Sequence, residues 1–277
     1  MSSSSSSADG PPPVAGVRSL GHATGLEILL LQGSVVEERS GYRVVRTPAN
    51  PTYHWGNFLL VDGAPEPGSL AEWVARFRAE HPTAAHVALG IDDPDPGLDP
   101  AEAVELGLAV ERDQALVASS LLPVEPIDGV ELRAVDPAND APWAALVDME
   151  LLDFEGGDVD GHREFLERRY AGHRELSAAG HGSWYAAWVG DRPVSTLGLF
   201  RLPSGRARYQ QVMTDPAYRQ RGIAGALLRF AAHDQQAQGA GDLVIVADPE
   251  GPAIGLYRRA GFVDAEPEWA LYASPPE

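Results

Sequence analysis

Hydrophobic positions in the second half of the chain follow both the helical and the strand period. After Gly222, apolar residues recur at Ile223, Ala226, Leu227 and Phe230, the stripe of a helix that packs on a sheet. The run at 243–247 is apolar throughout, as in a strand covered on both faces. We expect strands at 130–135, 183–189, 194–202, 207–214, 243–247 and 269–272, and helices at 138–151, 162–176, 222–236 and 252–260.

The first half has a weaker pattern with one clear helix. Leu70, Trp73, Val74 and Phe77 recur at helical spacing and predict a helix over 70–80. The remaining apolar segments predict strands at 26–31, 42–46, 57–61, 86–91 and 106–119, the last one interrupted. The fold class expected for the chain is therefore α/β or α+β.

Segments rich in Pro, Gly and Asp mark the breaks between elements, at 62–68, 92–100 and 123–129. A new strand is predicted directly after the third break. We therefore predict a disordered tail at 1–18, an N-terminal α/β domain at 19–125 and a second domain at 126–277.

Composition excludes several kinds of chemistry. The 277 residues include no Cys and no Lys, which removes disulfides, thiolate metal sites, a cysteine nucleophile, Schiff-base chemistry and a phosphate-binding P-loop lysine. A formal net charge of −19 argues against nucleic acid or an anionic membrane as a partner. No apolar run approaches a membrane span, and the start of the chain lacks the regions of a signal peptide. We expect a cytoplasmic protein that needs no metal.

The turn RQRGIAG at 219–225 has the features of an anion site. It leads from a predicted strand into a predicted helix N-terminus, where free N–H groups and the helix dipole favour negative charge. Six arginines and one acid lie within 201–230, a local excess of 6 − 1 = +5 in an acidic chain. The pattern predicts a negatively charged ligand, or else an amphipathic helix with solvated arginines.

Two motifs resemble the GCN5-related N-acetyltransferase (GNAT) superfamily. Residues 212–224, VMTDPAYRQRGIA, resemble its acyl-coenzyme A diphosphate loop, and Arg219, Gly222 and Ala224 occupy the defining positions. Residues 253–262, AIGLYRRAGF, are similar to its second signature. The resemblance covers about 130–277 and implies a mixed central sheet flanked by helices. We interpret the N-terminal domain as a degenerate copy of this fold, without a glycine-rich turn and without coenzyme A binding.

The resemblance also implies a reaction and a set of site residues. The chain would be an N-acyltransferase that moves an acetyl or related acyl group from acyl-coenzyme A to an amine of a small molecule by direct attack. Tyr257 would protonate the leaving thiolate. The expected cofactor-binding residues are Val212, Met213 and Thr214 along the pantetheine arm, with Arg219, Arg221, Gly222, Ile223, Ala224 and Gly225 around the diphosphate.

Two positions depart from the family pattern. The strand predicted at 207–214 has no Asp or Glu, where many relatives keep a carboxylate that serves as a base. Glu250 stands where relatives often have Asn. These departures leave open a noncatalytic acyl-coenzyme A sensor, and acyl transfer from a carrier protein is a further alternative.

The acceptor site has only indirect signals. The stretch 148–160 contains six acids and could attract a cationic amine, or be a solvated loop. The segment 50–57, NPTYHWGN, could form a second wall of the acceptor site or a structural turn. His22 and His54 are isolated, and we interpret them as structural.

Overall fold

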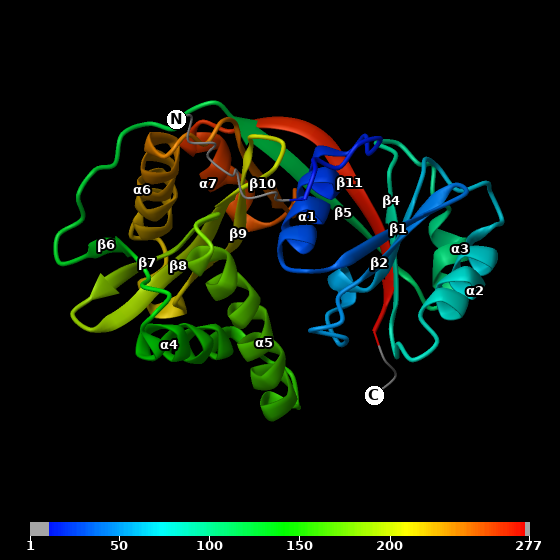
Figure 1. Cartoon of the computed structure of the whole chain (residues 1–277), viewed down its shortest axis with the longest axis horizontal. Helices are drawn as coiled ribbons and strands as arrows, with labels where there is room; N and C mark the ends of the chain where they lie inside the picture. The colour runs from blue at the N-terminus through cyan, green and yellow to red at the C-terminus, as the bar shows by residue number, and fades with distance from the viewer. Residues whose placement is uncertain (1–10, 275–277) are drawn as a thin grey trace, which may run out of the picture.

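One sheet of eleven strands forms the centre of the molecule (Figure 1). The computed structural model describes residues 11–274. Across the sheet the strand order is β1-β2-β3-β4-β11-β5-β10-β9-β8-β7-β6. The strands are β1 (Val35–Arg39), β2 (Tyr42–Arg46), β3 (Phe58–Val61), β4 (Val87–Ile91), β5 (Ala109–Ala118), β6 (Glu131–Ala134), β7 (Gly182–Val189), β8 (Arg192–Arg201), β9 (Ala207–Thr214), β10 (Leu243–Ala247) and β11 (Val263–Ala273). The helices are α1 (Leu20–Leu31), α2 (Leu70–Glu80), α3 (Pro100–Glu105), α4 (Asp140–Glu150), α5 (Val159–Ala178), α6 (Ile223–Ala237) and α7 (Pro252–Ala260), with short 3₁₀ turns at His54–Gly56, Leu151–Asp153 and Pro216–Tyr218.

The two halves of the sheet repeat one order of elements. In the first half, β1, β2 and β3 are followed by α2, β4, α3 and β5, and in the second half β7, β8 and β9 are followed by α6, β10, α7 and β11. Each half pairs its first three strands antiparallel, and its third strand lies parallel to its fourth. This repeated topology is consistent with our interpretation of the first half as a degenerate copy of the second.

The last strand of each half is exchanged with the other half. β4 pairs with β11, where Trp269 is opposite Ile91, and β10 pairs with β5, where Leu243 is opposite Ala118. β5 and β11 are also paired with each other and cross the middle of Figure 1 together. The boundary that we predicted near residue 126 therefore divides the chain between β5 and β6, while the sheet continues across it.

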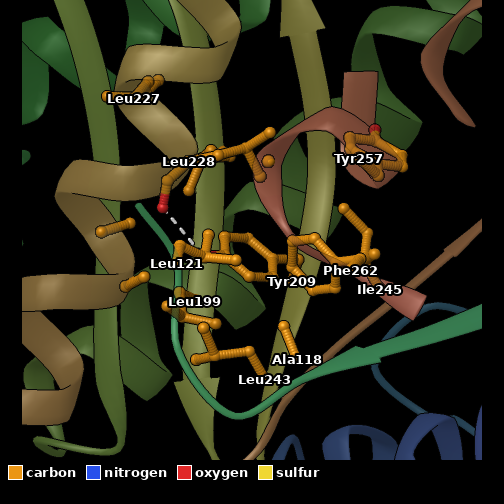
Figure 2. Packing of buried hydrophobic residues seen from close by; sticks show 14 of the residues in the cluster. Ala118, Leu121, Leu199, Tyr209, Leu227, Leu228, Leu243, Ile245, Tyr257 and Phe262 are labelled. Atoms are coloured by element: carbon orange, nitrogen blue, oxygen red, sulfur yellow. Dashed lines mark hydrogen bonds between the residues drawn. The ribbon is translucent and has the colours of Figure 1, made fainter. Parts of the chain in front are cut away.

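Helices cover both faces of the sheet in its second half. Side chains alternate between the two faces along each strand, and apolar side chains lie on both. On β7, Tyr185 and Ala187 face α6 and α7, whereas Trp184, Ala186 and Trp188 face α4 and α5. Figure 2 shows part of the first cluster, in which side chains from α6, β9, β10 and the segment after α7 interlock. The core thus fixes the position of α6 over β9 and β10.

The strand predicted at 26–31 is wrong, because these residues form the second half of α1. The helix starts after Ser19, whose side chain accepts a bond from the His22 N–H, and its packing against several strands buries most of its surface. A helix buried on nearly all sides has no polar stripe, and its apolar run is indistinguishable from that of a buried strand. The structure also shows β1 and α3, which we did not predict, and β5 begins only at Ala109.

The other elements are close to the predictions, except that β11 begins at Val263, well before the start predicted at residue 269. The helices at 70–80 and 252–260 and the strands at 42–46, 207–214 and 243–247 are confirmed with the same bounds. No helix within residues 11–274 is long and apolar enough to span a membrane.

The predicted tail lies partly outside the described residues. Residues 1–10 cannot be compared with the prediction. Closer to α1, the N–H groups of Arg18 and Ser19 both donate to the carboxylate of Asp92, the latter at 2.8 Å, and Val14 and Val17 pack on the N-terminal core. Residues 14–18 of the predicted tail therefore contact the N-terminal core.

Candidate active site

The parallel strands β9 and β10 separate soon after they meet. Ala207 is opposite Leu243 and Arg208 is opposite Val244, and no further residues of the two strands are partners. β9 continues to Thr214 and β10 to Ala247, so a cleft of about 410 Å³ opens between them. Its walls include Val212 and Met213 on one strand and Ala247 on the other.

A β-bulge interrupts β9 beside this cleft. Gly198 on β8 is opposite Gln210 and Thr196 is opposite Met213, which leaves Gln211 and Val212 without partners in β8. Gln211 has a φ of 45°, a backbone conformation that residues other than Gly rarely adopt. Bulges and local strain of this kind are typical of functional sites, where they take main-chain groups out of the ladder.

The N-terminus of α6 forms the floor of a second cavity. Gly222 is the N-cap residue with a φ of 79°, which favours Gly, and the first bond of the helix joins the Ala226 N–H to the Gly222 carbonyl at 3.0 Å. The N–H groups of Ile223, Ala224 and Gly225 therefore have no acceptor within the helix, and they are available to an anion.

This second cavity has a volume of about 820 Å³ and brings together most of the predicted site residues. It is lined by Val212, Met213, Thr214, Arg219, Gly222, Ile223, Ala224, Gly225 and Tyr257. Arg221 does not line it, because its guanidinium donates to the Ala217 carbonyl at 2.9 Å and lies 5.0 Å from the centre of the Tyr218 ring. A Cβ on Gly225 would lie 3.2 Å from Leu256, so this glycine also lets α7 approach α6.

The arginines predicted to surround the anion are spread over the molecule. Of the six in 201–230, only Arg219 lines the α6 cavity, and its guanidinium is paired with Asp153. Arg259, at the end of α7, lines the same cavity. The sequence motif gave no reason to select it, since its distance from α6 depends on how the two helices pack.

Tyr257 lies where the two cavities meet. It lines both, is only 4% exposed and packs edge-on against Phe262, with 6.3 Å between ring centres. Burial raises the pKa of Tyr257 to about 12, so the phenol keeps its proton at neutral pH. A buried phenol in this state can donate a proton to a developing anion.

Glu250, the departure from the second signature, is exposed and lines neither cavity. Its N–H donates to the Asp248 carboxylate at 2.8 Å, within the turn between β10 and α7. The structure gives this carboxylate no direct role at the cleft.

A third cavity, of about 460 Å³, adjoins the cleft between β9 and β10. The two share Tyr209, Gln210, Gln211 and Val246. Its other walls come from α1, α5, the sheet and the segment predicted as a second wall, through Asn50, Tyr53 and Trp55. The cavity therefore lies between the two halves of the chain and opens to the bulge.

Both isolated histidines have structural contacts. His22 lines the third cavity, but its two nitrogens are 3.2 Å from the Glu268 carboxylate and 3.3 Å from the Trp269 carbonyl. His54 stacks on His86 with 4.3 Å between ring centres, away from the cavity lining.

Ion pairs neutralise three of the six acids in the stretch 148–160. Asp148 pairs with Arg163, Glu150 with Arg169 and Asp153 with Arg219. Asp158 caps α5 by accepting a bond from the Gly161 N–H. The stretch thus acts mainly in local contacts, although Glu150 and Asp153 reach the wall of the cleft.

Sequence reasoning missed three carboxylates in the third cavity. Glu111 and Asp113 lie on β5 and Glu268 lies on β11, directly opposite Asp113. Burial, aided by the neighbouring carboxylates, raises the pKa of Asp113 to about 6. The only available signal was a charged segment just before the apolar end of β5, and it did not indicate where β5 lies in the sheet.

Comparisons with known proteins agree with this geometry. The model of the acetyltransferase (GNAT) family matches residues 143–262. No curated protein matches the sequence. Many solved structures share the fold, among them these three. A conserved protein of unknown function from Staphylococcus epidermidis has a TM-score of 0.68 and 13% identity, over 87% of this chain and 93% of that one. A GCN5-related N-acetyltransferase from Kribbella flavida has a TM-score of 0.62 and 14% identity, over 93% of this chain and 96% of that one. A second GCN5-related N-acetyltransferase, from Sphaerobacter thermophilus, has a TM-score of 0.56 and 18% identity, over 86% of this chain and 81% of that one.

Proposed function

We propose that the chain is an acyltransferase that moves an acetyl or related acyl group from acyl-coenzyme A to the amine of a small molecule. The match of residues 143–262 to the acetyltransferase (GNAT) family model supports this proposal. The observation that carries this proposal is the separation of β9 from β10. It joins the cavity at the α6 N-terminus to the cavity between the two halves, with Tyr257 beside the junction.

The residues at α6 suit the diphosphate of coenzyme A. Its negative charges would be held by the N–H groups of Ile223, Ala224 and Gly225, at the positive end of the helix dipole. Gly222 keeps side-chain atoms away from this position, and Arg219 and Arg259 add positive charge at the rim. Arg221 would contribute only its main-chain N–H.

The cleft suits the pantetheine arm. The main chain of Val212, Met213 and Thr214 would pair with its amides, as a strand pairs with its neighbour. The cosubstrate supplies the thioester, whose carbonyl carbon is the atom attacked. The bulge at Gln211 would then lie beside this thioester and leave main-chain groups free to contact its carbonyl.

The third cavity suits the acceptor. Its volume of about 460 Å³ falls within the range of small-molecule sites, which is why we propose a small molecule. The amine would reach the thioester past Gln210 and Gln211, and Tyr257 would protonate the departing sulfur.

Release of free thiol from acetyl-coenzyme A, measured against a panel of primary amines, tests the proposal. We expect amine-dependent thiol release from the wild-type chain. Binding of acetyl-coenzyme A without thiol release from any amine would instead support the noncatalytic sensor. Turnover that requires a phosphopantetheinyl carrier protein would support transfer from a carrier.

A further inference from the structure

We propose that Asp113, on β5 of the N-terminal half, is the base that accepts the proton of the acceptor amine. This inference rests on the function proposed above. It means that the half without a coenzyme A site completes the active site of the other half through its exchanged strand.

The exchange of β5 brings Asp113 to the end of β10. Gln114 is opposite Ala247 and Ala115 is opposite Val246, so Asp113 lies one position beyond the last pair. Alternate residues of a strand share a face, which puts Asp113 on the same face as Ala115 and Val246. Val246 lines both the cleft and the acceptor cavity, and Asp113 lines the acceptor cavity beside it.

Asp113 is partly buried at the wall of the cavity, and its carboxylate has no partner there. Within residues 11–274 the Asp113 carboxylate makes no hydrogen bond and no ion pair, unlike the carboxylates of Asp148 and Glu150. Two buried atoms in the lining of the cavity also lack partners there, Oε2 of Glu268 and Nε of Arg208. Because buried polar groups are nearly always hydrogen-bonded, unpaired groups around one cavity point to a polar ligand.

The groups that face Asp113 come from every neighbouring strand. Glu268 on β11, Glu111 on β5 and Asp248 after β10 are negative, and Arg208 on β9 is positive. Three carboxylates against one guanidinium favour a cationic ligand. His22 on α1 lines the same wall and is bonded to Glu268.

The surroundings also make Asp113 a better base. Burial is the main cause that raises the pKa of Asp113 to about 6, and the three carboxylates add to it. The group remains ionised at pH 7, and its proton affinity is closer to that of an amine than an exposed aspartate would provide.

The acids that line the cleft have partners. Glu150 is held by Arg169, Asp153 is held by Arg219, and Asp248 accepts a bond from the Glu250 N–H. Glu111 and Glu175 line the acceptor cavity but are exposed to solvent. Glu268 is already engaged with His22 through one oxygen.

The proton balance is simple. The ammonium gives one proton to Asp113, and the freed lone pair forms the C–N bond at the thioester carbon. The C–S bond breaks, and Tyr257 gives its proton to the sulfur. The second nitrogen proton then restores the Tyr257 phenol, directly or through water, and Asp113 releases its proton to solvent.

The experiment measures the pH dependence of kcat/KM for the best amine of the panel, with acetyl-coenzyme A saturating. In the wild type, kcat/KM should decrease as the pH falls below about 6, and this decrease is the acid limb of the profile. In Asp113→Asn, kcat/KM should fall about 10²-fold or more at pH 7, and this limb should disappear. The rate should recover as pH approaches the pKa of the amine itself, which then arrives neutral. Affinity for acetyl-coenzyme A, measured by calorimetry, should not change.

Glu111→Gln provides a second variant that keeps the base. Removing this neighbouring charge should lower the pKa of Asp113 and move the acid limb to lower pH. An unchanged profile in Asp113→Asn, or an acid limb that stays in place in Glu111→Gln, would overturn the inference while wild-type turnover still supports the proposed function. A wild type without amine-dependent turnover would instead refute the proposed function itself, and the assignment of Asp113 with it.

Discussion

Arg208 and Val244 are the last opposed residues of β9 and β10, and beyond this pair the two strands separate. A parallel ladder that stops after two pairs leaves main-chain groups of both strands without partners, and a buried strand edge normally needs some other partner. The separation is therefore the feature on which the proposed cosubstrate site depends.

Tyr257→Phe removes the proposed acid and keeps the ring. We expect kcat to fall by about 10²-fold or more, with little change in the KM for acetyl-coenzyme A, because the lost proton transfer affects the chemical step. Thiol release at saturating amine measures this. Tyr42→Phe in the N-terminal half, which loses only a bond to Glu80, serves as the control and should keep its kcat.

The raised pKa of Tyr257 also leads to a prediction for the rate at alkaline pH. Burial raises this pKa to about 12, and the acid must be protonated to act. Titration of Tyr257 should therefore cause no loss of kcat between pH 8 and about 10. A fall in kcat in that range that is absent in Tyr257→Phe would show that the phenol ionises much earlier than its surroundings imply.

The ion pair between Arg219 and Asp153 should oppose cosubstrate binding. Both side chains are partly exposed, so the pair contributes at most about 1 kcal/mol. Asp153→Asn frees the guanidinium, and we expect acetyl-coenzyme A to bind up to about fivefold more tightly at low salt. Arg219→Ala should weaken binding. Equal affinities of both variants and the wild type in a calorimetric titration would show that Arg219 does not contact the anion.

Acid should destabilise the fold through two buried histidines. Burial lowers the pKa of His81 to about 4 and that of His173 to about 3, against an ordinary value of 6.5. The unfolded chain takes up these protons first, so the free energy of unfolding should fall as pH decreases below 6.5, by about 1 kcal/mol per pH unit for each histidine. Urea unfolding at pH 7, 6 and 5 measures this. His81→Phe should reduce the slope, and a slope that stays the same would contradict the assignment.

The exchanged strands should make both halves unfold together. β5 and β11 each pair with strands of the other half, so neither half can open without breaking that ladder. We expect a single calorimetric transition. Leu60→Ala, deep in the N-terminal core, should cost about 2–5 kcal/mol and shift the whole transition to lower temperature. Two separate transitions, with only one displaced by Leu60→Ala, would instead support two independent domains.

The features predicted from the sequence are those with local signals. The apolar stripe after Gly222 predicted α6, the continuous apolar run predicted β10, and the pattern around Tyr257 predicted α7. Each signal lies within about ten residues, where periodicity and turn chemistry are informative.

The features that were missed depend on contacts between distant segments. α1 is buried on most sides, so its residues lack the polar stripe that identifies a surface helix. The exchange of β5 and β11 has no local signal, since the apolar pattern of either strand fits several neighbours. Asp113 could not be selected without this exchange, because only the sheet order brings it to the end of β10.

The central claim is that the cosubstrate diphosphate lies on the N-terminus of α6, and matched substitutions at the two ends of this helix test it most directly. Gly222 and Gly239 both have positive φ, 79° and 95°, and precede and follow the helix. A glutamate introduces the same charge and a similar backbone strain at either position. By calorimetric titration with acetyl-coenzyme A, we predict that Gly222→Glu abolishes binding whereas Gly239→Glu binds like the wild type. Binding by Gly222→Glu at wild-type affinity would contradict the claim.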